Sequence, residues 1–155
     1  MKKIVLSAAA LAAALALPGS PALAQTNEIT IGITTTTTGP GAALGIPERN
    51  ALEFVPKEIA GHPLKIILLD DGGDPTTATT NARRFVTESK ADVIMGSALT
   101  PPTIAVSNVA NEAGIPHFGL APFPITPERA KWSVAMPQPI PIVGKPLYEH
   151  MKAHN

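Results

Sequence analysis

Short apolar runs alternate with longer amphipathic stretches along most of the chain. The runs are rich in Ile, Val and Leu, and they predict five strands, at residues 29–33, 64–69, 91–95, 115–120 and 132–136. Helical spacing of apolar residues predicts four helices, at residues 42–59, 76–89, 101–112 and 140–154, and Pro56 is expected to kink or end the first of them. Strands that alternate with helices are typical of an α/β fold. We therefore predict a three-layer, doubly wound, mostly parallel sheet with helices on both faces.

Residues that favour helix ends support several of these boundaries. Asp74 is suited to cap a helix whose first position is Pro75, and Thr100 is suited to cap one that begins at the Pro101-Pro102 pair. Gly114 is expected to end that second helix. Five threonines, at residues 34–38, are expected to prolong the first strand and then supply hydroxyl groups to a loop.

The first 24 residues have the layout of a secretory signal peptide. Two lysines precede an apolar run at residues 4–17, and an A-x-A motif stands directly before Gln25. A membrane anchor is the weaker alternative, because the run is too short to span a bilayer comfortably. We therefore expect a signal peptide at residues 1–24, cleavage after Ala24 and export of a mature chain of residues 25–155.

Composition excludes several classes of protein. The chain has no cysteine, which excludes a disulfide scaffold, a Cys-ligated zinc site, an Fe–S cluster and a thiol nucleophile. Its 12 basic and 12 acidic residues balance, so there is no electrostatic footprint for nucleic acid. The serines and histidines show no triad arrangement. We therefore predict no catalytic residue, no enzymatic activity and no nucleic-acid partner.

Three aspartates and a glycine-rich loop need separate consideration. Asp70, Asp71 and Asp74 lack the alternation of an EF-hand, so we interpret them as a strand-end turn without a metal ion. The loop at residues 39–45 approaches the dinucleotide-binding fingerprint, but three residues separate its last two glycines and Pro40 removes a backbone donor. We favour a flexible turn and expect no cofactor. An exported dinucleotide-binding oxidoreductase is the alternative.

Ligands of doubly wound sheets bind beyond the carboxyl ends of the strands. This rule places interest on four loops, at residues 34–45, 70–75, 96–103 and 121–127. The third loop leads into a helix, and a helix start directs N–H groups and a positive dipole end at small anions such as carboxylates. Ser97, Thr100 and Thr103 belong to this loop, although Thr100 could equally be only the helix cap. The two prolines after it lack N–H groups, which leaves fewer donors than usual.

Six stretches, taken in order, carry a resemblance to a known family. They are residues 29–33, 38–45 with 49–51, 68–75, 93–96 with Thr100, 112–116 and 120–122. The sequence resembles the periplasmic substrate-binding proteins of ABC importers, in the branched-chain amino acid-binding (type 1) class. The match spans nearly the whole mature chain. In this family two Rossmann-like lobes are joined by hinge strands, and the ligand is held between them.

The resemblance implies that residues 25–155 are an incomplete N-terminal lobe, without the second lobe, and that this chain alone binds weakly. It implies a monomeric, periplasmic, solute-binding protein that captures an amino acid or other small carboxylate and docks on an ABC membrane permease. A ligand-sensing domain of a receptor is a further alternative. Thr100 matches a position that supplies a hydroxyl, and Ala121 one that supplies a carbonyl. Phe123 stands where threonine is common, so a less polar or aromatic carboxylate is our hypothesis. The predicted ligand-binding residues are Leu44, Ser97, Thr100, Thr103, Ala121 and Phe123.

Overall fold

One six-stranded sheet forms the centre of the computed structural model, which describes residues 28–154. The strands run in the order β2-β3-β1-β4-β5-β6 across the sheet. They are β1 (Ile29–Thr35), β2 (Glu58–Ile59), β3 (His62–Asp70), β4 (Val93–Met95), β5 (His117–Gly119) and β6 (Ser133–Ala135). Every neighbouring pair is parallel except β2 with β3. The predicted signal peptide lies outside the described residues.

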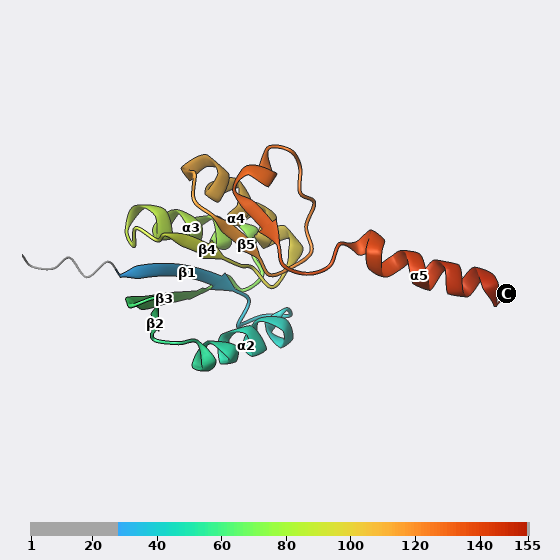
Figure 1. Ribbon diagram of the computed structural model, residues 1–155, viewed down its shortest axis with the longest axis horizontal. Helices are drawn as coiled ribbons and strands as arrows, with labels where there is room; N and C mark the ends of the chain where they lie inside the picture. The colour runs from blue at the N-terminus through green and yellow to red at the C-terminus, as the bar shows by residue number, and fades with distance from the viewer. Residues whose placement is uncertain (1–27, 155) are drawn as a thin grey trace, which may run out of the picture.

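Helices cover the two faces of the sheet and confirm the predicted three-layer α/β fold (Figure 1). Helices α3 (Pro75–Thr87) and α4 (Thr100–Ala113) lie together on one face, and α2 (Ala42–Ala51) lies on the other. Short 3-10 helices η2 (Leu52–Phe54) and η3 (Arg129–Lys131) complete the lobe. The main core lies under α3 and α4, where Phe85, Ile94 and Val106 are fully buried.

Local signals account for two of the helix ends, the start of α3 and the end of α4. Asp74 caps α3 by accepting a hydrogen bond from the Thr77 backbone N–H at 2.7 Å, and Pro75 takes the first helical position. Gly114 ends α4 in the left-handed conformation, at φ 70°. Thr100 does not cap α4 as predicted. The cap is Leu99, and the Thr100 hydroxyl bonds elsewhere.

The predicted helix at residues 42–59 was too long. It ends at Ala51, a 3-10 turn follows, and Val55 is already extended, with ψ 132°. The physical reason is Pro56, because the residue before a proline is driven out of the helical region. Beyond it, Glu58 and Ile59 form β2 and pair antiparallel with the start of β3.

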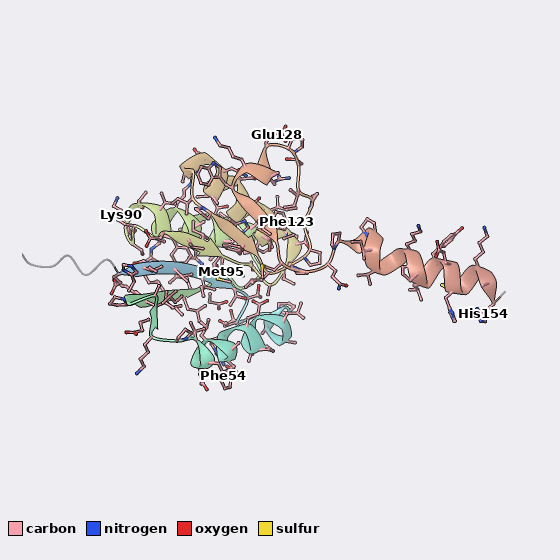
Figure 2. All side chains as sticks on the ribbon, viewed as in Figure 1. Phe54, Lys90, Met95, Phe123, Glu128 and His154 are labelled. Carbon is pink, nitrogen blue, oxygen red and sulfur yellow. The ribbon has the colours of Figure 1, made fainter. Side chains whose placement is uncertain are left out.

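The last predicted helix forms but does not cover the sheet. Helix α5 (Ile140–Ala153) extends away from the lobe, and its residues from Pro141 onward are exposed (Figures 1 and 2). Leu147 and Tyr148 are 62% and 67% exposed, which is unusual for large apolar side chains. Within residues 28–154, no helix combines the length and apolar character that crossing a membrane requires.

Candidate functional site

Four loops meet at one edge of the sheet, where the parallel strands β1, β3, β4 and β5 end. From β1 the chain passes to β3 on one side and then to β4 on the other, so the strand order reverses at β1. Crevices at such a switch point are the usual ligand sites of open α/β sheets. The four loops that the sequence singled out therefore lie at the edge of the sheet that holds the switch point.

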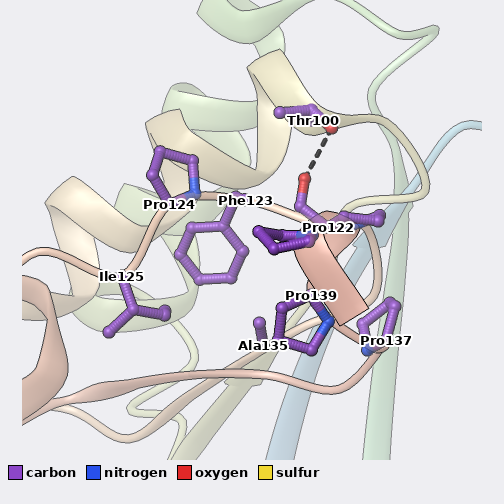
Figure 3. A pocket seen from close by; sticks show the side chains of 9 residues that line it. Thr100, Pro122, Phe123, Pro124, Ile125, Ala135, Pro137 and Pro139 are labelled. Carbon is purple, nitrogen blue, oxygen red and sulfur yellow. Dashed lines mark hydrogen bonds between the residues drawn. The ribbon is translucent and has the colours of Figure 1, made fainter. Parts of the chain in front are cut away.

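A cavity of about 480 Å³ opens beside two of these loops (Figure 3). Thr100 at the start of α4 and Phe123 after β5 both line it. The remaining lining residues are Pro122, Pro124, Ile125, Ala135, Pro137, Pro139 and Pro141. Thr100 supplies the one polar side chain among these nine residues, so the walls suit a largely apolar ligand.

The Thr100 hydroxyl holds two loops together. It donates a hydrogen bond to the Pro122 backbone carbonyl at 2.6 Å (Figure 3). The bond joins the start of α4 to the loop that carries Phe123. With its proton engaged by Pro122, the Thr100 oxygen can act towards a ligand only as an acceptor. A bound carboxylate would therefore compete with Pro122 for this proton or use a backbone N–H group.

Ser97 and Thr103 lie inside the lobe and brace the loop between them. Both side chains are fully buried. The Ser97 N–H donates to Thr103 Oγ1 at 2.9 Å, and Thr103 Oγ1 contacts the carbonyl oxygens of Ser97 and Leu99, each at 2.8 Å. Neither residue lines the cavity. The structure therefore brings Ser97 and Thr103 together inside the lobe, away from the lining of the cavity that Thr100 and Phe123 share.

Of the three remaining predicted residues, one lines the cavity and two do not. Phe123 is 8% exposed, and its ring lies 5.8 Å from that of His117. Ala121 is also buried, two residues before it. Leu44, by contrast, is 56% exposed on α2 and does not line the cavity. Thr100 and Phe123 are thus the pair of predicted residues that share the cavity.

Sequence reasoning missed the wall formed by Ala135 and the prolines at positions 137, 139 and 141. Ala135 ends β6, Pro137 and Pro139 belong to the segment that leads into α5, and Pro141 lies in the first turn of that helix. The available signal was proline density, since eight of the 17 prolines lie between residues 116 and 146. Proline fixes its own backbone angle, so such a segment holds its shape without helix or sheet bonds.

The acidic turn after β3 is held by its own hydrogen bonds. Burial opposes ionisation of Asp70, but hydrogen bonds from the Thr38 hydroxyl and from the Gly72 and Thr37 N–H groups outweigh it and lower its pKa to about 2. Among residues 28–154, there is no cluster of three or more His, Cys, Asp or Glu side chains that could hold a metal ion.

Gly45, the last glycine of the predicted loop, lies inside α2 and allows close packing of that helix. A Cβ atom at this position would lie 2.0 Å from the Thr36 carbonyl oxygen. Glycine therefore lets α2 approach the end of β1 closely. Gly39 takes a positive φ of 73° in the turn before the helix. Both positions are accounted for by chain packing and turn geometry.

A second cavity, of about 280 Å³, separates α2 from the sheet. Ile31, Ile33 and Leu68 supply part of its apolar floor, and Glu48 lies at its side. Burial is the main cause that raises the pKa of Glu48, opposed by its hydrogen bond from the Thr35 hydroxyl. This face of the sheet is thus less completely covered than the face under α3 and α4.

The structure is an α/β lobe with a cavity at the loop edge of its sheet, and comparison with known proteins assigns its family. A family model described as periplasmic binding protein matches residues 28–137, and the chain belongs to this family. The resemblance to the N-terminal lobe of type 1 periplasmic binding proteins is thereby confirmed. No curated protein matches the chain.

Three solved structures illustrate the similarity. An extracellular ligand-binding receptor from Rhodopseudomonas palustris HaA2 is 82% identical, with a TM-score of 0.81 over 83% of this chain and 36% of that one. An ABC transporter solute-binding protein from R. palustris BisB5, in complex with 3,4-dihydroxybenzoic acid, is 25% identical, with a TM-score of 0.62 over 69% and 31%. A leucine-binding protein from Thermotoga maritima shares the fold at 21% identity, with a TM-score of 0.65 over 77% and 35%. The chain thus spans about a third of the length of these relatives.

Proposed function

We propose that this chain is the first ligand-binding lobe of an ABC importer's solute-binding protein, and that it captures a small carboxylate with an aromatic body. The observation that carries the proposal is the cavity shared by Thr100 and Phe123 beside the switch point of the sheet. In this role the protein is a non-enzymatic, monomeric, periplasmic receptor that delivers its ligand to a membrane permease.

The walls of the cavity favour an aromatic ligand over an amino acid. Phe123 and the surrounding prolines offer flat apolar surfaces, against which an aromatic ring packs well. None of the nine lining residues carries a carboxylate to pair with a ligand ammonium group. The start of α4 supplies the positive end of a helix dipole for the ligand's carboxylate. The dihydroxybenzoic acid complex of the R. palustris BisB5 relative supports the same class of ligand.

A second lobe is part of the proposal. The apolar side chains of α5 need a partner surface, and the solved relatives are about three times as long as the matched region. We assign α5 to the part of that second lobe that lies next to the first lobe. The proline-rich segment before α5 then forms part of the connection between the two lobes. The cavity then lies where two lobes would close on a ligand, and closure would shift the protein towards its bound state.

The proposal is tested by titrating residues 25–155, labelled with ¹⁵N, with benzoate and separately with leucine. A single lobe contacts one face of a ligand, so binding with a Kd of about 1 mM or weaker is expected, which chemical-shift titration detects. Benzoate should shift the amide signals of residues 97–103 and 121–125, and leucine should not. Equal responses to both ligands, or shifts confined to other loops, would contradict the aromatic assignment.

Two matched variants locate the site. Phe123→Leu keeps an apolar side chain but removes the ring, and it should weaken benzoate binding by about fivefold. Phe54→Leu makes the same change on a side chain that is 88% exposed and lies far from the cavity (Figure 2), so binding should stay unchanged. Equal affinities for the two variants would place the ligand elsewhere.

A further inference from the structure

A buried carboxylate lies behind the ligand-facing loops. Asp71 is 2% exposed and directly follows β3. Its Oδ1 accepts hydrogen bonds from the Thr36 hydroxyl at 2.8 Å and from the Gly73 N–H at 2.9 Å. Its Oδ2 accepts one from the Thr34 hydroxyl at 3.1 Å. One side chain therefore contacts the end of β1 and the turn after β3.

The network extends to the loop after β4. Thr36 Oγ1 lies 3.4 Å from Ser97 Oγ, and both side chains are fully buried. A hydroxyl has one proton to donate, and Thr36 donates its proton to the carboxylate. Ser97 must therefore be the donor in its contact with Thr36. The hydrogen bonds run in one direction, from Ser97 to Thr36 to Asp71.

A second branch has the same direction. Asn81 of α3 donates from Nδ2 to Thr34 Oγ1 at 3.1 Å, and Thr34 donates in turn to Asp71. The carboxylate, which only accepts, thus orients the hydroxyl groups on both sides of it. Three loops, whose bonded residues lie up to 61 positions apart, are joined through one group.

We propose that Asp71 is a positioning residue for ligand binding, which holds the loop at residues 96–103 in its binding geometry through Thr36 and Ser97. The connection continues from Ser97, whose N–H is held by Thr103 Oγ1, to the turn that presents Thr100. Asp71 lines neither of the cavities described above, so it acts through this chain of hydrogen bonds. The inference rests on the proposed function, because it assigns Asp71 to that same site.

The substitutions separate positioning from stability. Thr36→Val keeps the shape of the side chain and removes its hydroxyl, while Thr36→Ser keeps the hydroxyl and serves as the rescue. Asp71→Asn and Ser97→Ala break the network at its two ends. The control is Asp92→Asn, since Asp92 Oδ2 accepts from the Thr30 N–H at 2.8 Å at the opposite edge of the sheet.

Two measurements are made on residues 25–155. Benzoate affinity should fall about tenfold in Asp71→Asn, Thr36→Val and Ser97→Ala, and should stay within about twofold of the original in Thr36→Ser and Asp92→Asn. Amide exchange at Ser97 should accelerate in the first three variants, whereas Asp92→Asn should accelerate exchange at Thr30. The unfolding free energy of each variant is measured alongside, and Thr36→Val and Ser97→Ala suffice if Asp71→Asn does not fold.

The outcomes distinguish this inference from the proposed function. Unchanged affinity and unchanged Ser97 exchange in folded Thr36→Val and Ser97→Ala would overturn the positioning role. The positioning role would also be overturned if benzoate affinity fell as much in Asp92→Asn as in the network variants. The loss of affinity would then reflect only a loss of folding stability. If the original chain binds no aromatic carboxylate, the proposed function fails. Ser97 exchange still decides whether Asp71 orders the loop, because that measurement needs no ligand.

Discussion

Substitution of Gly45 by alanine is expected to destabilise the lobe, although alanine is the better helix former. The added Cβ would lie 2.0 Å from the Thr36 carbonyl oxygen and 2.9 Å from Thr35 Oγ1. Since the nearer atom belongs to the backbone, no side chain can rotate away to make room. To reach 3.0 Å, α2 and the end of β1 would have to separate by about 1 Å, and close-packed interiors resist such shifts.

The magnitude follows from two opposing contributions. Overpacking of this kind costs about 3 kcal/mol, while replacing glycine by alanine inside a helix returns about 1 kcal/mol. The net loss expected in the unfolding free energy is therefore about 2 kcal/mol. A loss of this size is a large fraction of the stability of a small domain.

Urea unfolding followed by Trp132 fluorescence measures this loss, because the one tryptophan of the chain belongs to the lobe. The control is Gly144→Ala in α5, where a Cβ would meet nothing within 4 Å apart from its chain neighbours and the backbone of its own helix. That variant should leave the Trp132 transition unchanged and raise the helical circular dichroism signal, since α5 gains about 1 kcal/mol of helix propensity. If Gly45→Ala is as stable as the original chain, the close approach of α2 to β1 is refuted.

Two further predictions concern stability, and one concerns the cavity. Burial lowers the pKa of His117 from 6.5 despite its hydrogen bond to the Gly96 carbonyl, so the unfolded chain binds the proton first. Stability should therefore fall as the pH drops below about 6.5, and the dependence should flatten in His117→Gln in urea unfolding at pH 5 to 8. Asp74→Ala removes the α3 cap and should cost about 1 kcal/mol by the same assay, whereas Asp74→Asn should cost less. Thr100→Val removes the bond to Pro122 and should broaden the amide signals of residues 121–125 without a ligand; unchanged signals would contradict its role between the loops.

The alternation of strands and helices could be predicted because it depends on local periodicity. A buried parallel strand needs a short apolar run, and a helix on the sheet needs apolar residues at helical spacing. Asp74 and Gly114 act on their own neighbours in the chain, so their roles as helix ends were also readable. Pro56 also acts on its direct neighbour in the chain, because it drives Val55 out of the helical region and so ends the helical stretch that begins with α2.

The candidate site was predicted in part. The rule about loop position pointed to Thr100 and the family resemblance pointed to Phe123, and the structure places both on one cavity. The same rules suggested Ser97 and Thr103, which are buried within the lobe. Loop position alone does not say whether a side chain points inward or outward, because that depends on partners elsewhere in the chain.

The sequence by itself determined the class of fold and the family, and it predicted the edge of the sheet at which we propose that a ligand binds. Only the tertiary structure decided which hydroxyl groups face the cavity and which serve the network around Asp71. Hydrogen bonds between loops 61 residues apart leave no local pattern, since each partner alone is an ordinary polar loop residue. The spacing of apolar residues predicted α5, and only the structure showed that its apolar side chains are exposed and lie off the sheet (Figure 1).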